Sequence, residues 1–242
     1  MTIGLVLLHA FPLDARMWAR QLGGQHTVAP DLPGFGEAPP AGDVMTMEAA
    51  ATRCLDVMDE AGLERAVVCG LSMGGYVAFE LWRRARDRVA GLVLANTRAN
   101  ADPPEAAEGR RALAARLRDE GSGFLVASPP PLLSAEAPQD LREHVAQLIA
   151  AQAPSAIAAA ALGMAERPDS TADLATIDVP TLVITSDGDT LIPPEVSLSM
   201  AAHVPGAETA VIEGAGHLSN LERPDDFDAL LRAHLERCGA VR

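Results

Sequence analysis

The sequence contains no lysine. All 19 of its basic residues are arginine, and they stand against 33 acidic residues, so the formal net charge is −14 at pH 7. Without a lysine amine, the chain has no means of forming a lysine Schiff base with a carbonyl substrate. An acidic surface repels nucleic acids and anionic membranes, so we expect neither as a partner.

Cysteine is also scarce. The chain has three cysteines, Cys54, Cys69 and Cys238, and none of them forms a Cys-x-x-Cys pair. An odd count without such a pair argues against a disulfide framework or a cysteine-based zinc site. No apolar run approaches the length of a membrane span. The apolar start of the chain, MTIGLVLLHAF, has no basic leader and no small-residue cleavage site. We therefore expect a cytoplasmic protein with no metal and no organic cofactor.

Six short apolar runs predict strands. Most lack polar alternation, as expected of strands that are buried on both faces of a parallel sheet. Helical patterns lie between them, and 242 residues suit one large α/β domain. The sequence therefore predicts a doubly wound, mostly parallel sheet of about six strands: Ile3–Leu8, Thr27–Ala29, Ala66–Cys69, Val89–Ala95, Thr181–Thr185 and Thr209–Ile212.

The strand–helix alternation stops between Thr97 and Thr176, where only helical patterns occur: Pro104–Arg118, Pro138–Gln152 and Pro154–Glu166. Connections in α/β units usually have two to six residues, so a segment this long favours an inserted helical lid over one end of the sheet. The alternative is that these helices pack on the sheet itself. We expect one domain, 1–242, with a core of 1–97 and 173–242 and a lid of 98–172.

The strongest motif is Gly70-Leu71-Ser72-Met73-Gly74-Gly75. It has the Gly-x-Ser-x-Gly pattern and stands between a predicted strand and the helical run Tyr76–Arg86, the context that a nucleophilic serine requires. The turn must be sharp enough to expose the serine hydroxyl, and the glycines remove side chains that would collide. The alternative is a glycine-rich turn with an incidental serine. We favour Ser72 as a nucleophile.

A serine hydroxyl needs a base, and His217 is the candidate. It follows the last predicted strand in the glycine-containing run Glu213–His217, which leaves the loop free to bring an imidazole to the sheet edge. His144, His203 and His234 lie in helical patterns instead. His9, at a strand end, is expected to hold its loop through backbone hydrogen bonds.

The base needs an acid that fixes its tautomer. Asp187 and Asp189 both follow the strand Thr181–Thr185, and either could serve. We choose Asp189, because it lies farther past the strand end and precedes Pro193-Pro194, which would make its loop rigid. Asp187 would then shape the turn. The chain order Ser, Asp, His is that of α/β hydrolases.

Acyl transfer also requires donors for an oxyanion. The Met73 amide stands at a predicted helix N-terminus, where the helix dipole favours negative charge. A second amide is expected from the loop His9-Ala10-Phe11-Pro12, with the Phe11 backbone as its best donor.

Together these motifs resemble the α/β-hydrolase superfamily, within it the small enol-lactonase, carboxylesterase and non-haem peroxidase group. The resemblance extends over residues 9–217 and rests on motifs in family order: His9-Ala10-Phe11-Pro12, Asp31-Leu32-Pro33-Gly34-Phe35-Gly36, the Ser72 motif, Asp189-x-x-x-Pro193 and Gly214-Ala215-Gly216-His217. It implies an α/β-hydrolase fold with six parallel strands, lacking the two strands that usually precede the first one here.

A second departure concerns the oxyanion loop. The family usually has His-Gly where this chain has His9-Ala10, and alanine restricts the backbone more than glycine. One reading is therefore strain at Ala10 and a less well placed Phe11 amide. The alternative is that Ala10 has an ordinary φ and the pocket is already formed.

The leading hypothesis is hydrolysis of a small carboxylic ester or lactone through an acyl-serine intermediate, with this small molecule as the expected partner. One alternative keeps the same three residues for perhydrolysis or for cleavage of carbon–carbon bonds. Another is a ligand-binding sensor with slow turnover, which strain at Ala10 would favour. An anionic substrate would need an arginine in the pocket, for which Arg98 is the obvious candidate.

Overall fold

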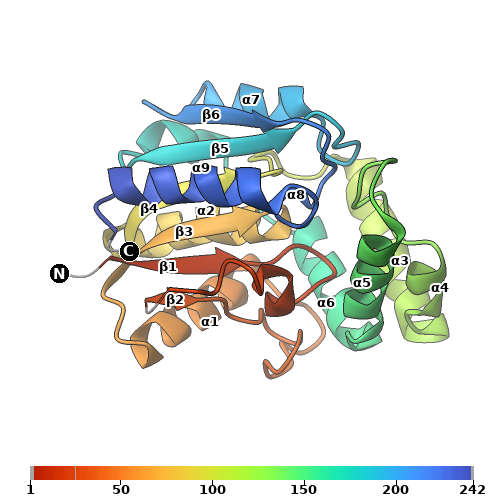
Figure 1. The fold of residues 1–242 in the computed structure, drawn as a ribbon. Helices are drawn as coiled ribbons and strands as arrows, with labels where there is room; N and C mark the ends of the chain where they lie inside the picture. Colours follow the sequence, from red (N-terminus) through yellow and green to blue (C-terminus); the bar gives the residue numbers. More distant parts are fainter. Residues whose placement is uncertain (1–2, 25, 241–242) are drawn as a thin grey trace.

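A computed structural model describes residues 3–24 and 26–240. Its centre is one sheet of six strands in the order β2-β1-β3-β4-β5-β6, and every neighbouring pair is parallel (Figure 1). This confirms the predicted all-parallel sheet. The strands are β1 (Ile3–Leu8), β2 (Thr27–Val28), β3 (Arg65–Leu71), β4 (Val89–Ala95), β5 (Thr181–Ser186) and β6 (Glu208–Ile212).

The strand order places a reversal point between β1 and β3. The chain passes from β1 to β2 on one side, crosses back to β3, and then continues to β6 on the other side. In open parallel sheets, ligands bind beyond the carboxyl ends of the strands at such a point. The loop after β1 and the turn after β3 meet here, so topology alone brings the Phe11 loop and Ser72 together.

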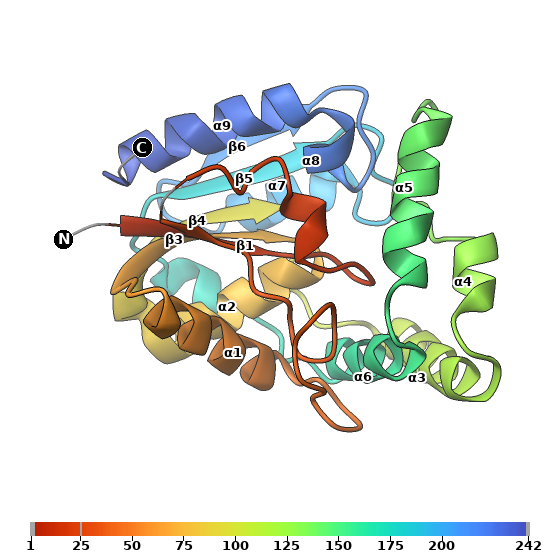
Figure 2. The same cartoon turned by 60° about the horizontal axis from the view of Figure 1, so that its bottom comes forward.

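Helices cover both faces of the sheet. Figure 2 shows α1 (Met47–Glu60) and α2 (Met73–Ala85) on one face and α9 (Pro224–Arg237) on the other. The side chain of Thr46 accepts a hydrogen bond from the Ala49 amide at 3.0 Å and caps α1, as its position before the apolar face predicts. Two further helices follow β5 and β6: α7 (Pro194–Ala201) and α8 (Ser219–Glu222).

The segment 98–172 folds into helices that gather beyond the carboxyl ends of the strands rather than on a face of the sheet (Figures 1 and 2). The short helix α4 was not predicted, because five residues are too few for a helical pattern to be recognised. Nearly all of α6 is buried. The helices are α3 (Pro104–Glu120), α4 (Gly123–Ala127), α5 (Gln139–Ala150) and α6 (Pro154–Ala165).

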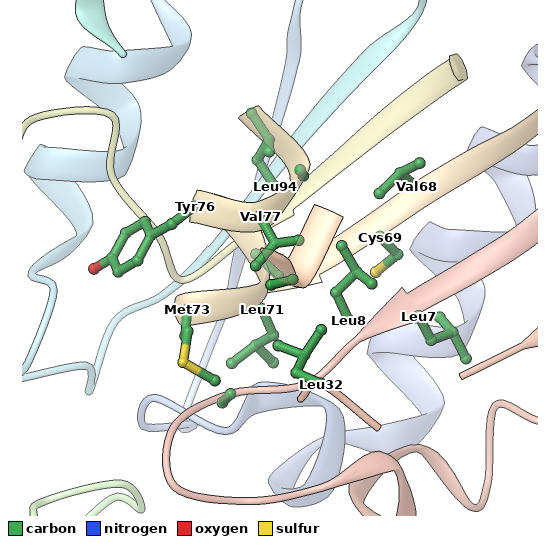
Figure 3. Close-up of a cluster of buried hydrophobic side chains, with 14 of the residues drawn as sticks. Leu7, Leu8, Leu32, Val68, Cys69, Leu71, Met73, Tyr76, Val77 and Leu94 are labelled. Carbon is green, nitrogen blue, oxygen red and sulfur yellow. The ribbon is translucent and has the colours of Figure 1, made fainter. Parts of the chain in front are cut away.

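The hydrophobic core extends to the turn that carries Ser72. Leu8 of β1, Leu32 of the loop after β2 and Leu71 of β3 are fully buried and lie together beneath the first turn of α2, which begins at Met73 (Figure 3). Burial of each such side chain stabilises the fold by about 1.5–3 kcal/mol. The serine therefore stands on a tightly packed support.

Among the described residues, no single helix has the length and apolar character to cross a membrane. Only α5 and α6 taken together have that length and apolar character, and these two helices are bent by 92° relative to each other.

Candidate active site

Ser72 occupies the turn between β3 and α2 in a strained backbone conformation, with φ 55° and ψ −112°. Two residues at the end of β4 fix its backbone: the Ser72 amide donates to the Ala95 carbonyl at 2.9 Å, and the Thr97 hydroxyl donates to the Ser72 carbonyl at 2.8 Å. The side chain is half-buried although both neighbours are buried. Strain of this kind persists only where the surrounding structure imposes it, which is common at reactive centres.

The glycines of the motif are required by close packing. A β-carbon at Gly70 would collide with the Gly74 carbonyl, and one at Gly74 would collide with the Leu8 carbonyl at the end of β1. The missing side chains therefore let the end of β1 approach the first turn of α2. This contact brings the Phe11 loop next to Ser72.

Asp189 and His217 form a buried pair beyond the ends of β5 and β6, with His217 Nδ1 2.8 Å from Asp189 Oδ2. The other carboxylate oxygen accepts hydrogen bonds from the amides of Leu191 and Ile192 at 2.9 and 3.0 Å. Burial alone would raise the pKa of Asp189, but the hydrogen bonds from His217, Ile192 and Asn96 hold that pKa below its ordinary value. An ionised carboxylate only accepts, so Nδ1 carries the proton and Nε2 is left as the basic nitrogen.

Asp187 does not contact His217 and instead stabilises a turn. It is exposed, and its carboxylate accepts a hydrogen bond from the Gly214 amide at 2.7 Å, which ties the end of β5 to the loop after β6. Of the two aspartates that follow β5, Asp189 is therefore the one that contacts His217, and Asp187 is in the turn.

Sequence reasoning missed Asn96, a further partner of Asp189. Asn96 is fully buried at the end of β4, with φ 45°. Its Nδ2 donates to Asp189 Oδ2 at 3.0 Å and to the Ser186 hydroxyl at 3.1 Å, while its Oδ1 accepts from the Ser219 hydroxyl at 2.8 Å. The only signal in the sequence is an asparagine directly after a buried strand, since asparagine tolerates positive φ better than most residues.

The loop after β1 is held by His9, as predicted. The His9 ring is fully buried, its Nδ1 lies 3.1 Å from the Ala10 carbonyl, and its Nε2 accepts from the Leu32 amide at 3.0 Å. Burial lowers the pKa of His9, which keeps the ring neutral and suits this acceptor role. Phe11 follows, half-buried, and Met73 is the first residue of α2, where helix amides have no acceptor within the helix.

The expected strain at Ala10 is wrong. Among the described non-glycine residues, only Ser72 and Asn96 have positive φ, so Ala10 adopts a backbone conformation that alanine tolerates. The Ala10 amide instead lies 3.2 Å from Met17 Sδ in the buried interior. Methionine fills the space behind the loop, and the family's glycine is not needed here.

Ser72 and His217 lie at the same edge of the sheet, but no hydrogen bond joins them within residues 3–24 and 26–240. Catalytic hydrogen bonds are often long in unliganded sites and shorten when substrate binds. Within the same residues, no group of three or more His, Cys, Asp or Glu is placed to hold a metal ion.

The helical segment is fastened to the loops of this site. Gln152, beyond α5, is buried; its Nε2 donates to Asp14 Oδ2 at 2.6 Å, and its Oε1 accepts from the Gly36 amide at 3.1 Å. Asp14 follows the Phe11 loop, so one side chain ties α5 to the loop that carries the expected oxyanion donor.

A cluster of ion pairs within the helical segment is centred on Asp102, just before α3. Its buried carboxylate accepts from Arg98 at 2.7 Å, from Arg167 at 3.0 Å and from Arg110. Burial favours the neutral acid, but the hydrogen bonds from Arg167 and Arg110 hold the pKa of Asp102 below its ordinary value. Arg98, the candidate for binding an anionic substrate, is therefore already paired with a carboxylate of the chain.

A cavity of about 690 Å³ lies between the helical segment and the loop that carries Asp189. Its walls come from α4, the proline-rich connection to α5 and α5 itself, and they include Leu132, Leu133 and Val145. Gly188 and Thr190, on either side of Asp189, complete the lining.

Residues 5–230 match the Alpha/beta hydrolase family, and the chain belongs to it. Among solved structures, a thermophilic esterase from Thermogutta terrifontis, with malate bound, superposes with a TM-score of 0.94 at 42% identity, covering 98% of this chain and 91% of that one. The enol-lactonase from Burkholderia xenovorans LB400 has a TM-score of 0.84 at 27% identity, covering 98% and 92%. The fold is therefore the α/β-hydrolase fold.

A curated relative is longer than this chain. The dihydrolipoyllysine-residue acetyltransferase component of the acetoin cleaving system of Cupriavidus necator is 30% identical over 244 residues, which are 96% of this chain but only 63% of that protein.

Proposed function

We propose that this chain is a serine hydrolase that cleaves small carboxylic esters or lactones through an acyl-serine intermediate. The observation that carries the proposal is the combination of Ser72, strained and half-buried at φ 55°, with a buried Asp189–His217 pair at the same sheet edge. The similarity to a solved esterase and a solved enol-lactonase supports the choice of ester and lactone substrates.

In this mechanism, His217 Nε2 removes the proton from Ser72 Oγ, which attacks the substrate carbonyl carbon. The amides of Met73 and Phe11 donate to the resulting oxyanion. The intermediate collapses, the alcohol leaves with the proton from His217, and the acyl group stays on Ser72. Water, deprotonated by His217, then attacks the acyl-serine and releases the acid. Asp189 stabilises the imidazolium throughout.

We assign the segment 98–172 to the role of lid, because its helices stand beyond the strand ends and Gln152 fastens it to the site loops through Asp14 and Gly36. The net charge of −14 disfavours strongly anionic substrates, and Arg98 is already paired with Asp102. We therefore expect neutral esters to be cleaved faster than their anionic analogues. The slow-sensor alternative rested on strain at Ala10 and loses that support.

A panel of aryl esters and lactones that differ in chain length and charge tests the proposal. We expect multiple turnovers on short neutral esters and a loss of about 10⁴-fold or more in kcat for Ser72→Ala. Hydrogen peroxide and a 1,3-diketone, added as further arms, separate perhydrolysis and carbon–carbon cleavage from hydrolysis. A single slow acylation, or full activity in Ser72→Ala, would overturn the proposal.

A further inference from the structure

Glu222, the last residue of α8, bridges two segments that are far apart in the sequence. Its Oε1 accepts a hydrogen bond from the Gly216 amide at 2.7 Å and from the Ser134 amide at 3.0 Å. Its Oε2 accepts from the Ser134 hydroxyl at 2.5 Å and from the Ser134 amide at 3.1 Å. Gly216 directly precedes His217, and Ser134 belongs to the connection between α4 and α5. One half-buried carboxylate therefore joins the base loop to the helical segment.

The contacts around Gly216 leave no room for a side chain. A β-carbon there would collide with the Ser134 amide nitrogen. On the other side of His217, the Leu218 amide donates to the Leu132 carbonyl at 2.9 Å. The connection is itself held in place, because Arg142 donates to the Ser134 carbonyl at 2.8 Å. The peptide groups before and after His217 thus both rest on the same anchored connection.

From these contacts we infer that Glu222 is a positioning residue for the reaction. It sets the backbone that carries His217 by holding the Gly216 amide, and it uses Ser134 as the fixed point. Hydrogen bonds to a carboxylate are stronger than those between neutral groups, so this one side chain restrains the loop effectively. The inference rests on the proposed function, in which His217 Nε2 acts on Ser72.

A positioning role and a merely structural role predict different kinetics. The contacts of Glu222 run to backbone amides beside His217, and none of them runs to Ser72 or the Phe11 loop. Loss of the carboxylate should therefore displace the imidazole and lower kcat, while KM for a small ester stays close to its original value. A displacement of about 1 Å at a reacting group costs on the order of 10²-fold in rate.

The test compares Glu222→Ala, Glu222→Gln and Glu213→Ala by steady-state kinetics on one short aryl ester, with active sites counted by titration so that unfolded protein does not contribute. Glutamine keeps an oxygen for the Gly216 and Ser134 amides, but its NH₂ group can only donate, so it can pair with the Ser134 hydroxyl and not with the Ser134 amide. Glu213 is an exposed carboxylate of the same loop and makes none of the described hydrogen bonds, so Glu213→Ala removes an equal charge. His217→Ala is measured in parallel.

We expect Glu222→Ala to lower kcat by about 10- to 100-fold with KM changed less than about threefold. Glu222→Gln, which keeps the acceptor for the Gly216 amide, should recover part of this loss, and Glu213→Ala should leave kcat within about twofold. An unchanged kcat in Glu222→Ala beside an inactive His217→Ala overturns the positioning role alone. Equal losses in Glu222→Gln and Glu222→Ala would also overturn it, because charge and not the hydrogen bond would then matter. Activity in His217→Ala overturns the proposed function and this inference together.

Discussion

The two aspartates that follow β5 offer an isosteric pair of substitutions with opposite expected outcomes. Asp189 is buried, and its two oxygens accept four hydrogen bonds, from His217, Asn96, Leu191 and Ile192. In Asp189→Asn, the new NH₂ group must face either His217 and Asn96 or the two backbone amides. In either orientation the NH₂ group faces at least one N–H donor with which it cannot pair. When it faces His217, Nδ1 must become the acceptor, so the proton moves to Nε2, which then no longer serves as a base.

Loss of the correct tautomer in a serine triad costs about 10⁴ in kcat, which corresponds to about 5 kcal/mol in activation free energy. In Asp187→Asn, the amide oxygen can still accept the one hydrogen bond from Gly214, so we expect a change within about threefold. Steady-state kinetics on an activated ester, normalised to titrated active sites, measures both variants. Equal losses, or a larger loss in Asp187→Asn, would refute the assignment of Asp189.

Further predictions concern the support of the site and the stability of the fold. Asn96→Ala removes the buried amide that donates to Asp189, so urea titration should show a loss of about 2–3 kcal/mol in unfolding free energy. Asn96→Gly loses the same hydrogen bonds but tolerates the positive φ at this position, so its loss of unfolding free energy should be smaller than that of Asn96→Ala. Leu71→Ala should cost about 2–5 kcal/mol in the same assay, because Leu71 is fully buried beneath the serine turn. His234 is buried, which lowers its pKa from 6.5 to about 4, so the unfolded chain binds a proton in this range and the folded chain does not. The unfolding free energy should therefore fall as the pH drops from 6.5 towards 4, and it should fall less in His234→Gln.

The strands were predictable because a parallel sheet buries its strands as continuous apolar runs. Ile3–Leu8 and Val89–Ala95 have the predicted bounds; β2, β5 and β6 differ by one residue at one end, and β3 is longer by one residue at its start and two at its end. The expectation for 27–29 was one residue too long, since β2 is a two-residue edge strand that only β1 pairs. Helices of ten or more residues were equally visible from their periodicity, whereas α4 was too short.

The three proposed catalytic residues could be predicted because each follows a strand end within a glycine-containing or aspartate-containing motif. Their supports could not. Asn96 reaches Asp189 across 93 positions of sequence, and Ser134 reaches Glu222 across 88. Such contacts depend on how separate segments pack, which no local pattern records. Strain at Ala10 was predicted wrongly for a related reason, because a residue type alone does not determine φ.

The central claim is that Ser72 is the nucleophile, and covalent labelling tests it most directly. The intact protein is treated with a serine-directed phosphonate, and the adduct is located by peptide mass spectrometry, with Ser72→Ala as the control. We expect one adduct per chain, on Ser72, with no labelling of the Ser72→Ala variant. An adduct on another serine, or no adduct on a protein that hydrolyses esters, would contradict it.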